Sequence, residues 1–244
     1  MILYFILLYI IINYIIATFA FNPPLIPTYT LEDIDYIYNG IAIKIIRKTL
    51  SSKVILFNHN NADDIGICSN YCKWLSNFTN CTVIFYDYIG YGLSTKGALT
   101  EYNLLKSADI VYFFTTRVLN IDPNNLYIVG KSLGTVPATY LSKYKNNGLL
   151  LISPMLSGIR IYYDHNMPYL DNFCFPNNIR IRDVKSKIGI IHGTEDKLIN
   201  VKHTYELLNI IENKYKPLII KAGHNNIETT NTNEFINYVK KFLD

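Results

Sequence analysis

Short runs of apolar residues alternate, from residue 28 to residue 244, with stretches in which apolar residues recur every three or four positions. The runs are typical of strands buried on both faces, and the stretches between them are typical of amphipathic helices. We expect strands at 41–47, 53–58, 82–87, 125–130, 148–153, 187–192 and 216–221. We expect helices at 64–78, 101–119, 132–145, 201–213 and 233–243. This alternation predicts an α/β fold with a mostly parallel central sheet and helices on both of its faces.

The first residues of the chain follow a different pattern, because segment 1–21 contains no charged side chain. About 20 apolar residues are enough to span a bilayer as a helix. Segment 1–21 therefore predicts a membrane anchor. The alternatives are a cleaved signal peptide with its site near Ala20, which would make the protein secreted or lumenal, and a buried core helix. The prolines within 23–27 cannot continue a helix, and residues 22–244 are expected to form a single domain.

Composition and charge exclude several classes of protein. The chain has 244 residues, of which 50% are hydrophobic and 17% charged, so it can bury a full core and is not disordered. The net charge is +4 and the basic residues are scattered, which argues against nucleic-acid binding. The four cysteines, at positions 68, 72, 81 and 174, lack zinc-site partners. We expect buried thiols, with a disulfide only in an oxidising compartment, and no metal or cofactor.

The turn after the strand at 125–130 carries the first candidate for chemistry. It reads GKSLG, the G-x-S-x-G nucleophile elbow, and it stands between a predicted strand and a predicted helix, as that motif requires. Gly130 and Gly134 allow the strand and the helix to approach each other, and the turn exposes the serine hydroxyl above the sheet. Ser132 is therefore the candidate nucleophile.

Two later turns supply the partners that a serine nucleophile needs. Asp196 follows the strand at 187–192, and His224 follows the strand at 216–221. Because ligands of such sheets bind at the carboxyl ends of the strands, we expect these side chains to meet Ser132 there. His224 would take the hydroxyl proton, and the Asp196 carboxylate would orient the imidazole. The order Ser, Asp, His is the order of α/β-hydrolase triads.

Other residues of the same types have different interpretations. Glu195 is the competing acid, directly before Asp196. The remaining histidines are interpreted as a loop residue, a structural strand-end residue and a residue of an exposed helix face; they are His165, His192 and His203.

The loop after the strand at 53–58 is where α/β-hydrolases build half of their oxyanion hole. It begins His59-Asn60-Asn61. We expect the backbone N–H groups of Asn61 and Leu133 to stabilise the oxygen that becomes negatively charged, with His59 and Asn60 as the supporting loop. Asn60 stands where glycine is usual. Asparagine tolerates a left-handed backbone better than other non-glycine residues, so the turn can keep that conformation.

Several segments carry a resemblance to a known family. They are FNPP at 21–24, FNHNNADDIG at 57–66, FYDYIGYGLS at 85–94, IVGKSLGTVPA at 128–138, SPMLSGIR at 153–160, IIHGTEDKLI at 190–199 and AGHNNIE at 222–228. Together they resemble the α/β-hydrolase superfamily, and within it the lidless palmitoyl-protein thioesterases around α/β hydrolase domain-containing protein 17. The resemblance implies the α/β-hydrolase fold, a Ser132–Asp196–His224 triad and removal of acyl chains from cysteine thioesters. Those relatives carry an acylated N-terminal cysteine cluster, whereas this chain has no cysteine before Cys68.

We therefore predict a membrane-anchored, monomeric serine hydrolase that forms an acyl-enzyme at Ser132 and acts on acylated proteins or small acyl esters. The segment 154–186, between two predicted strands, is too short for a sizeable cap domain, so the site is expected to be open to a bulky substrate. The alternatives are a carboxylesterase or monoacylglycerol-type lipase and, in a different class, an inactive binding module on the same fold.

Overall fold

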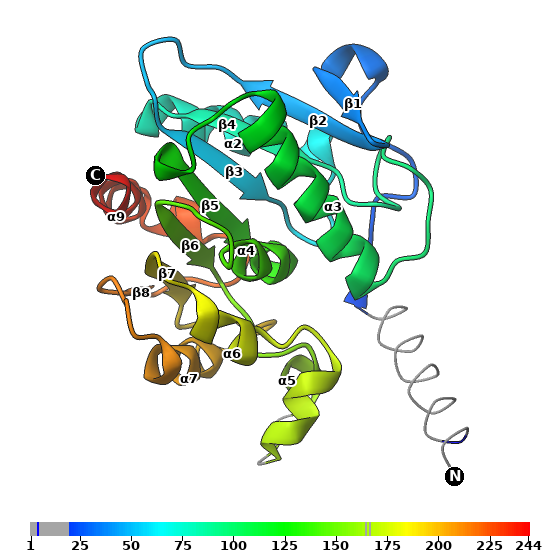
Figure 1. The fold of residues 1–244 in the computed structure, drawn as a ribbon. Coiled ribbons are helices and arrows are strands. Elements are labelled where there is room, and N and C mark those ends of the chain that lie inside the picture. Colours follow the sequence, from blue (N-terminus) through cyan, green and yellow to red (C-terminus); the bar gives the residue numbers. More distant parts are fainter. Residues whose placement is uncertain (1–3, 5–19, 164, 166) are drawn as a thin grey trace.

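An eight-stranded sheet forms the centre of the computed structural model, which describes residues 4, 20–163, 165 and 167–244 (Figure 1). The strand order is β1-β2-β4-β3-β5-β6-β7-β8. The strands are β1 (Tyr36–Tyr38), β2 (Ile41–Ile46), β3 (Val54–Asn58), β4 (Thr82–Tyr86), β5 (Leu126–Lys131), β6 (Gly148–Ile152), β7 (Lys187–Gly193) and β8 (Leu218–Ile220). The pairs from β4 to β8 are parallel, and β2 pairs antiparallel with both β1 and β4. The predicted mostly parallel sheet is confirmed.

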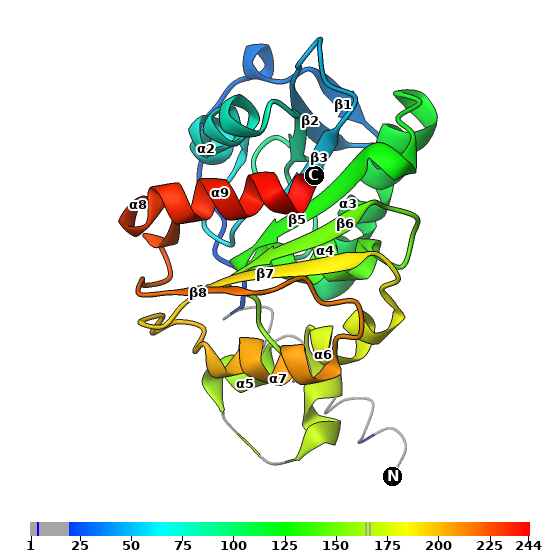
Figure 2. The ribbon, with the colours of Figure 1, turned by 90° about the vertical axis from the view of Figure 1, so that its left-hand side faces the viewer.

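Helices cover both faces of this sheet (Figure 2). The α-helices are α2 (Ile65–Thr79), α3 (Glu101–Phe113), α4 (Thr135–Leu141), α5 (Ile159–Tyr162), α6 (Asn177–Arg180), α7 (Lys202–Ile210), α8 (Ile227–Thr230) and α9 (Thr232–Leu243). Shorter turns are the 3-10 segments Leu31–Asp33, Pro123–Asn125, Ser132–Gly134, Pro168–Phe173 and Ile181–Asp183, and the π-helical turn Phe114–Val118. Helices α3, α4 and α7 bury side chains in one hydrophobic cluster, and α2, α8 and α9 bury theirs in the other.

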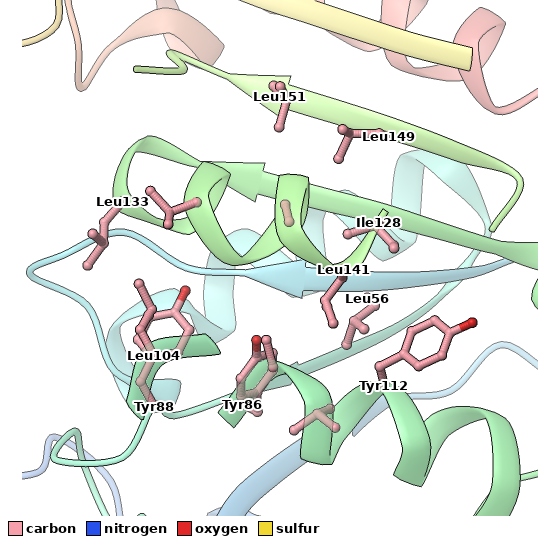
Figure 3. Packing of buried hydrophobic residues seen from close by; sticks show 14 of the residues in the cluster. Leu56, Tyr86, Tyr88, Leu104, Tyr112, Ile128, Leu133, Leu141, Leu149 and Leu151 are labelled. Carbon is pink, nitrogen blue, oxygen red and sulfur yellow. The ribbon is translucent and has the colours of Figure 1, made fainter. Parts of the chain in front are cut away.

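The strands separate these two clusters because successive side chains of a strand point to opposite faces. Leu56 of β3 joins the cluster on the side of α3, whereas Phe57 joins the cluster on the side of α2. Figure 3 shows the first cluster from close by, with Leu56 and Ile128 of neighbouring strands near Tyr112 of α3. Strands with two buried faces explain the continuous apolar runs in the sequence.

The predicted strands are all present, with ends shifted by one or two residues, and β1 is an additional strand. Three predicted helices differ more, and one of them, expected at 201–213, ends at Ile210. The helix expected at 101–119 ends as an α-helix at Phe113, and the β-branched residues that follow, Thr115 and Thr116 among them, adopt a π-helical turn. The helix expected at 132–145 begins as a 3-10 turn and ends at Leu141, because the serine turn has its own backbone conformation.

The N-terminal part of the domain runs beside the loop that follows β3. Phe21 is buried, and its ring lies edge-on to that of Phe175, with 5.7 Å between the centroids. The Thr28 N–H donates to Asp64 Oδ2 (2.7 Å), and Asp64 also caps α2 through the N–H of Ile67 (3.0 Å). The predicted anchor at 1–21 lies outside the described residues except at Tyr4, Ala20 and Phe21. No helix among the residues described here is long and apolar enough to cross a membrane.

Candidate active site

Ser132 stands at the end of β5 in a turn that few side chains tolerate. Its φ is 53°, in the left-handed region that non-glycine residues rarely adopt. A Cβ atom on Gly130 would overlap the carbonyl oxygen of Gly134, and one on Gly134 would overlap that of Asn58. Both elbow glycines are therefore needed for the close approach of β5, β3 and the start of α4. The turn stores backbone strain at the residue expected to be the nucleophile.

The loops after β7 and β8 bring an acid and a base to this serine. His224 Nε2 lies 2.8 Å from Ser132 Oγ, and His224 Nδ1 lies 2.7 Å from Asp196 Oδ2. One tautomer serves both contacts: Nδ1–H donates to the carboxylate, and Nε2 accepts from the serine hydroxyl. The structure thus brings together the three side chains that the sequence predicts as nucleophile, base and acid.

Asp196 is held as a carboxylate by its hydrogen bonds. Oδ1 accepts from the N–H groups of Leu198 (2.9 Å) and Ile199 (2.8 Å), and His192 Nε2 lies 3.3 Å from Oδ2. Burial by itself would raise the pKa of Asp196, but the hydrogen bonds from His192 and His224 hold that pKa well below its usual range. The residue is therefore charged at neutral pH, as orienting a histidine requires.

The other acidic and histidine side chains near the triad make contacts that do not involve Ser132. Glu195 is exposed and lies 3.7 Å from Lys221. His192 is buried in a structural position, with Nδ1 at 2.6 Å from the Thr204 hydroxyl. The interpretation of His203 as an exposed helix residue is wrong. It lies on the inner face of α7, is buried, and accepts a hydrogen bond from the N–H of Leu156 (3.0 Å).

The cysteines are free and buried at all four positions, which the structure describes in full, so the expected buried thiols are confirmed. Burial raises the pKa of the Cys68 and Cys174 thiols. No group of three or more His, Cys, Asp or Glu side chains in the described ranges is arranged to hold a metal ion.

Ser132, Asn61 and Leu133 border a cavity of about 500 Å³. The Asn61 side chain is fixed, because its Oδ1 accepts from the Asn22 N–H and from the Tyr91 hydroxyl (both 2.8 Å). This fixes the loop whose backbone N–H the sequence predicts as one of two oxyanion donors.

The expectation of a left-handed backbone at Asn60 is wrong, since Asn60 is absent from the residues of positive φ in the described chain. The loop is held by hydrogen bonds instead. The Tyr88 hydroxyl donates to the His59 carbonyl (2.8 Å), and His59 Nδ1 lies 2.7 Å from the Asn60 carbonyl. Burial lowers the pKa of His59 to about 4, so the ring is neutral at pH 7 and Nδ1–H is the donor. With an ordinary backbone, asparagine replaces glycine without strain.

The wall of the cavity is almost entirely apolar. Most of it comes from the segment between β6 and β7, and it includes Met155, Ile159, Ile161, Tyr162, Tyr163 and Phe175. The described residues of that segment form α5, α6 and two 3-10 turns, and no cap domain is seen among them. An apolar cavity that begins at a hydroxyl paired with histidine can hold an acyl chain with its carbonyl at the hydroxyl.

One feature of the site is not singled out by the sequence analysis. Lys131, the variable residue of the elbow before Ser132, forms an ion pair with Glu228 of α8 (Nζ to Oε1 2.6 Å). Both side chains are buried, and the ammonium lies 5.3 Å from the centroid of the Tyr71 ring. The pair joins the serine turn to the loop that carries His224. Both residues fall in segments that carry the family resemblance, which was the only signal for them.

Comparisons with known proteins give the family and the fold. No protein-family model matches the chain. Human α/β hydrolase domain-containing protein 17B is 34% identical over 208 residues, 84% of this chain and 71% of the relative. The mouse 17C protein is 32% identical over 208 residues, which are 84% of this chain and 64% of the relative. An esterase from Pyrococcus furiosus superposes with a TM-score of 0.69 at 17% identity, over 91% of this chain and 98% of its own. A monoacylglycerol lipase from Paleococcus ferrophilus superposes with a TM-score of 0.64 at 15% identity, over 83% of this chain and 98% of its own.

Proposed function

The chain belongs to the α/β hydrolase domain-containing protein 17 family and is a hydrolase of that fold, and on this basis we propose that it removes acyl chains from protein thioesters through a serine nucleophile. The observation that carries the proposal is the unbroken hydrogen-bond chain from Ser132 through His224 to Asp196, whose serine borders an apolar cavity.

The reaction has two half-reactions at the same serine. His224 Nε2 takes the proton of the Ser132 hydroxyl as the oxygen attacks the thioester carbonyl. The N–H groups of Asn61 and Leu133 stabilise the resulting oxyanion. The C–S bond then breaks, His224 gives its proton to the leaving sulfur, and the acyl group stays on Ser132. A water molecule, deprotonated by His224, attacks the acyl-enzyme, and the carboxylic acid leaves as the serine regains its proton.

The two sides of the cavity suit the two parts of such a substrate. The apolar wall takes the acyl chain, and the short segment 154–186 leaves the leaving-group side open to a folded protein. Hydrolysis of small acyl esters, as by a carboxylesterase or monoacylglycerol lipase, is the second candidate, because the same wall accepts the acyl chain of any ester.

The proposal includes attachment to a membrane through the uncharged segment 1–21. Deleting residues 1–19, which keeps Ala20 at the cavity and Phe21 against Phe175, is expected to move the protein to the soluble fraction and to spare turnover of a soluble thioester. Turnover of acylated protein in vesicles should fall steeply, because the tether raises the local concentration of membrane-bound substrate. A mature full-length protein that already lacks these residues would show that the segment is a signal peptide.

Ser132→Ala tests the catalytic assignment. The variant is expected to lose both labelling by a fluorophosphonate probe and hydrolysis of an S-palmitoyl peptide, with an unchanged melting temperature. Ser153→Ala is the matched control, because Ser153 follows the neighbouring strand β6, is buried and also has a positive φ of 50°. It should keep full labelling.

Two outcomes would count against the proposal. Labelling that persists in Ser132→Ala would contradict the nucleophile. A wild-type enzyme that hydrolyses a monoacylglycerol but not the S-palmitoyl peptide would replace the thioesterase with the lipase.

A further inference from the structure

Three tyrosines at the end of β4 and in the turn after it are buried beside the loop that follows β3. They are Tyr86, Tyr88 and Tyr91, and none of them is more than 1% exposed. Burial raises the pKa of all three hydroxyl groups, so they stay protonated and act as donors. A buried hydroxyl without an acceptor is costly, and each of these hydroxyls has one.

The three acceptors lie close together in the chain, on the last residue of β3 and the loop after it. They are Asn58 Oδ1 for Tyr86 (2.6 Å), the His59 carbonyl for Tyr88 (2.8 Å) and Asn61 Oδ1 for Tyr91 (2.8 Å). Figure 3 shows Tyr86 and Tyr88 with their hydroxyl groups turned toward β3 and the chain that leaves it. The segment 86–91 therefore holds the segment 58–61 at three points.

One peptide group of this loop, between Asn60 and Asn61, carries the N–H that is expected to meet the oxyanion. A peptide group is planar and trans, so its N–H points away from its carbonyl. The carbonyl of this group, that of Asn60, lies 2.7 Å from His59 Nδ1. The His59 ring packs on the Tyr88 ring, with 4.2 Å between the centroids. Fixing the carbonyl in this way also fixes the direction of the Asn61 N–H.

The Asn61 side chain holds the other side of the same peptide group. Its Oδ1 accepts from the Asn22 N–H and from the Tyr91 hydroxyl, both at 2.8 Å. Since a backbone N–H can only donate, the amide presents its oxygen to both groups. No acceptor for the Asn61 N–H itself is found in the described part of the chain, and Asn61 borders the cavity together with Ser132. This N–H is therefore available to an oxyanion.

We propose that Tyr88 and Tyr91 are positioning residues, which aim the Asn61 N–H at the oxyanion before the substrate arrives. The inference rests on the proposed function, because it assigns the same N–H to stabilisation of the oxyanion. It extends that function to two residues that do not line the cavity. Donors that are fixed in advance need no reorganisation during the reaction, and this makes them effective. Tyr86 holds Asn58, further along the chain from the donor, and contributes less.

Replacement of tyrosine by phenylalanine tests the proposal, because it removes only the hydroxyl. In full-length Tyr88→Phe and Tyr91→Phe, kcat for a soluble thioester should fall about tenfold and KM should stay within about twofold, since a misaimed donor weakens only the transition state. The matched control is Tyr112→Phe on α3, because Tyr112 is also buried and donates to a backbone carbonyl, that of Lys145 (2.8 Å). Its melting temperature should fall as in Tyr88→Phe, but its kcat should stay within about twofold of wild type.

A trifluoromethyl ketone with an apolar chain measures stabilisation of the oxyanion without turnover. Ser132 Oγ adds to the ketone carbon, the serine proton passes to His224, and the ketone oxygen becomes the oxyanion. The inhibition constant should rise about tenfold in Tyr88→Phe and Tyr91→Phe, in parallel with the fall in kcat. Asn61→Leu keeps the backbone N–H but offers Tyr91 no acceptor, and it should show the same rise.

The outcomes separate this proposal from the proposed function. Unchanged kcat and ketone affinity in both tyrosine variants would overturn the positioning, and so would equal losses in Tyr112→Phe. If wild type bound the ketone but hydrolysed no thioester, the proposed function would fail, while the ketone affinities of the variants would still decide the positioning. A wild-type protein that neither bound the ketone nor hydrolysed a thioester would contradict both.

Discussion

The triad is a network of paired polar side chains, whereas the wall of the cavity beside it is apolar and partly exposed. Ser132, Asp196 and His224 stand on turns directly after strands, and each is hydrogen-bonded to the next. Tyr162, Tyr163 and Leu198 of this wall lie outside the sheet, and their side chains are more than half exposed. The difference reflects two physical requirements: bond cleavage needs atoms fixed to within a fraction of an ångström, and contact with an apolar group needs apolar area without fixed partners.

The same difference extends to energetics. Buried polar groups of the triad are stabilising only while they keep their partners, so a substitution that leaves a buried charge such as Asp196 unpaired is expected to change both stability and rate. Exposed side chains of the cavity wall have little influence on the free energy of unfolding, as is usual for surface positions. Substitutions at Tyr162, Tyr163 or Leu198 should therefore change substrate binding more than stability.

The largest effect after that of Ser132→Ala is expected for Asp196→Asn. The amide favours the wrong tautomer of His224, and kcat should fall by on the order of 10⁴-fold. Glu195→Gln is the matched control, because Glu195 is exposed and faces Lys221; its kcat should change by less than about twofold. Steady-state kinetics with a soluble thioester measure both. A larger loss in Glu195→Gln would reassign the acid.

The ion pair between Lys131 and Glu228 should give the next largest effect. Lys131→Met leaves the Glu228 carboxylate buried without its partner, and the free energy of unfolding in urea should fall by about 3 kcal/mol. The Lys131→Met/Glu228→Leu variant should recover most of this loss, because no unpaired charge remains. Since the pair positions the serine turn against the histidine loop, kcat should fall more than KM changes.

Lys221→Met provides the exposed counterpart of this test. Its pair with Glu195 is exposed, and the variant should be as stable as wild type to within about 0.5 kcal/mol. If Lys131→Met and Lys221→Met lowered the free energy of unfolding by similar amounts, burial of the Lys131–Glu228 pair would not matter for stability.

A smaller effect is expected in the pH dependence of stability, through His59, which is buried directly after β3. The unfolded chain takes up a proton at this residue as the pH falls below about 6.5, whereas burial lowers the pKa of His59 to about 4 in the native state. The native protein should therefore lose about 1 kcal/mol of stability between pH 7.5 and pH 5.5 at this group. His59→Gln should lack that loss.

The difference between the stability curves of wild type and His59→Gln separates the contribution of His59 from that of its neighbour Asp87. Burial raises the pKa of Asp87 to about 7, so this carboxyl stabilises the fold as the pH falls, in the opposite direction. Asp87 is present in both proteins and cancels in the difference. Parallel stability curves for wild type and His59→Gln would contradict a neutral, buried His59.

The smallest effect is expected at Asn60. Because its backbone is not left-handed, Asn60→Gly and Asn60→Val should both keep kcat/KM within about twofold of wild type. A loss confined to the valine variant would show that the loop adopts a left-handed turn during the reaction.

The site was predictable as far as local signals reach. The GKSLG turn between a strand and a helix, and the positions of Asp196 and His224 after later strands, were enough to expect the three side chains together. The interpretation of His203 failed because the helical pattern did not show which face of α7 is turned inward. The oxyanion loop was located, but its backbone was misjudged from residue type, since hydrogen bonds from Tyr88 and within the loop hold it.

The amino-acid sequence by itself determined the succession of strands and helices, the strained serine turn and the order of nucleophile, acid and base. These follow from periodicity and turn residues, which act over a few positions, and from the rule that strand ends of a parallel sheet share one edge. Only the tertiary structure decided that Lys131 meets Glu228 and that Phe21 packs on Phe175 of the cavity wall. It alone also left Tyr162, Tyr163 and Leu198 of that wall exposed. Such contacts join residues far apart in the chain, and they depend on how whole elements pack, which no local pattern encodes.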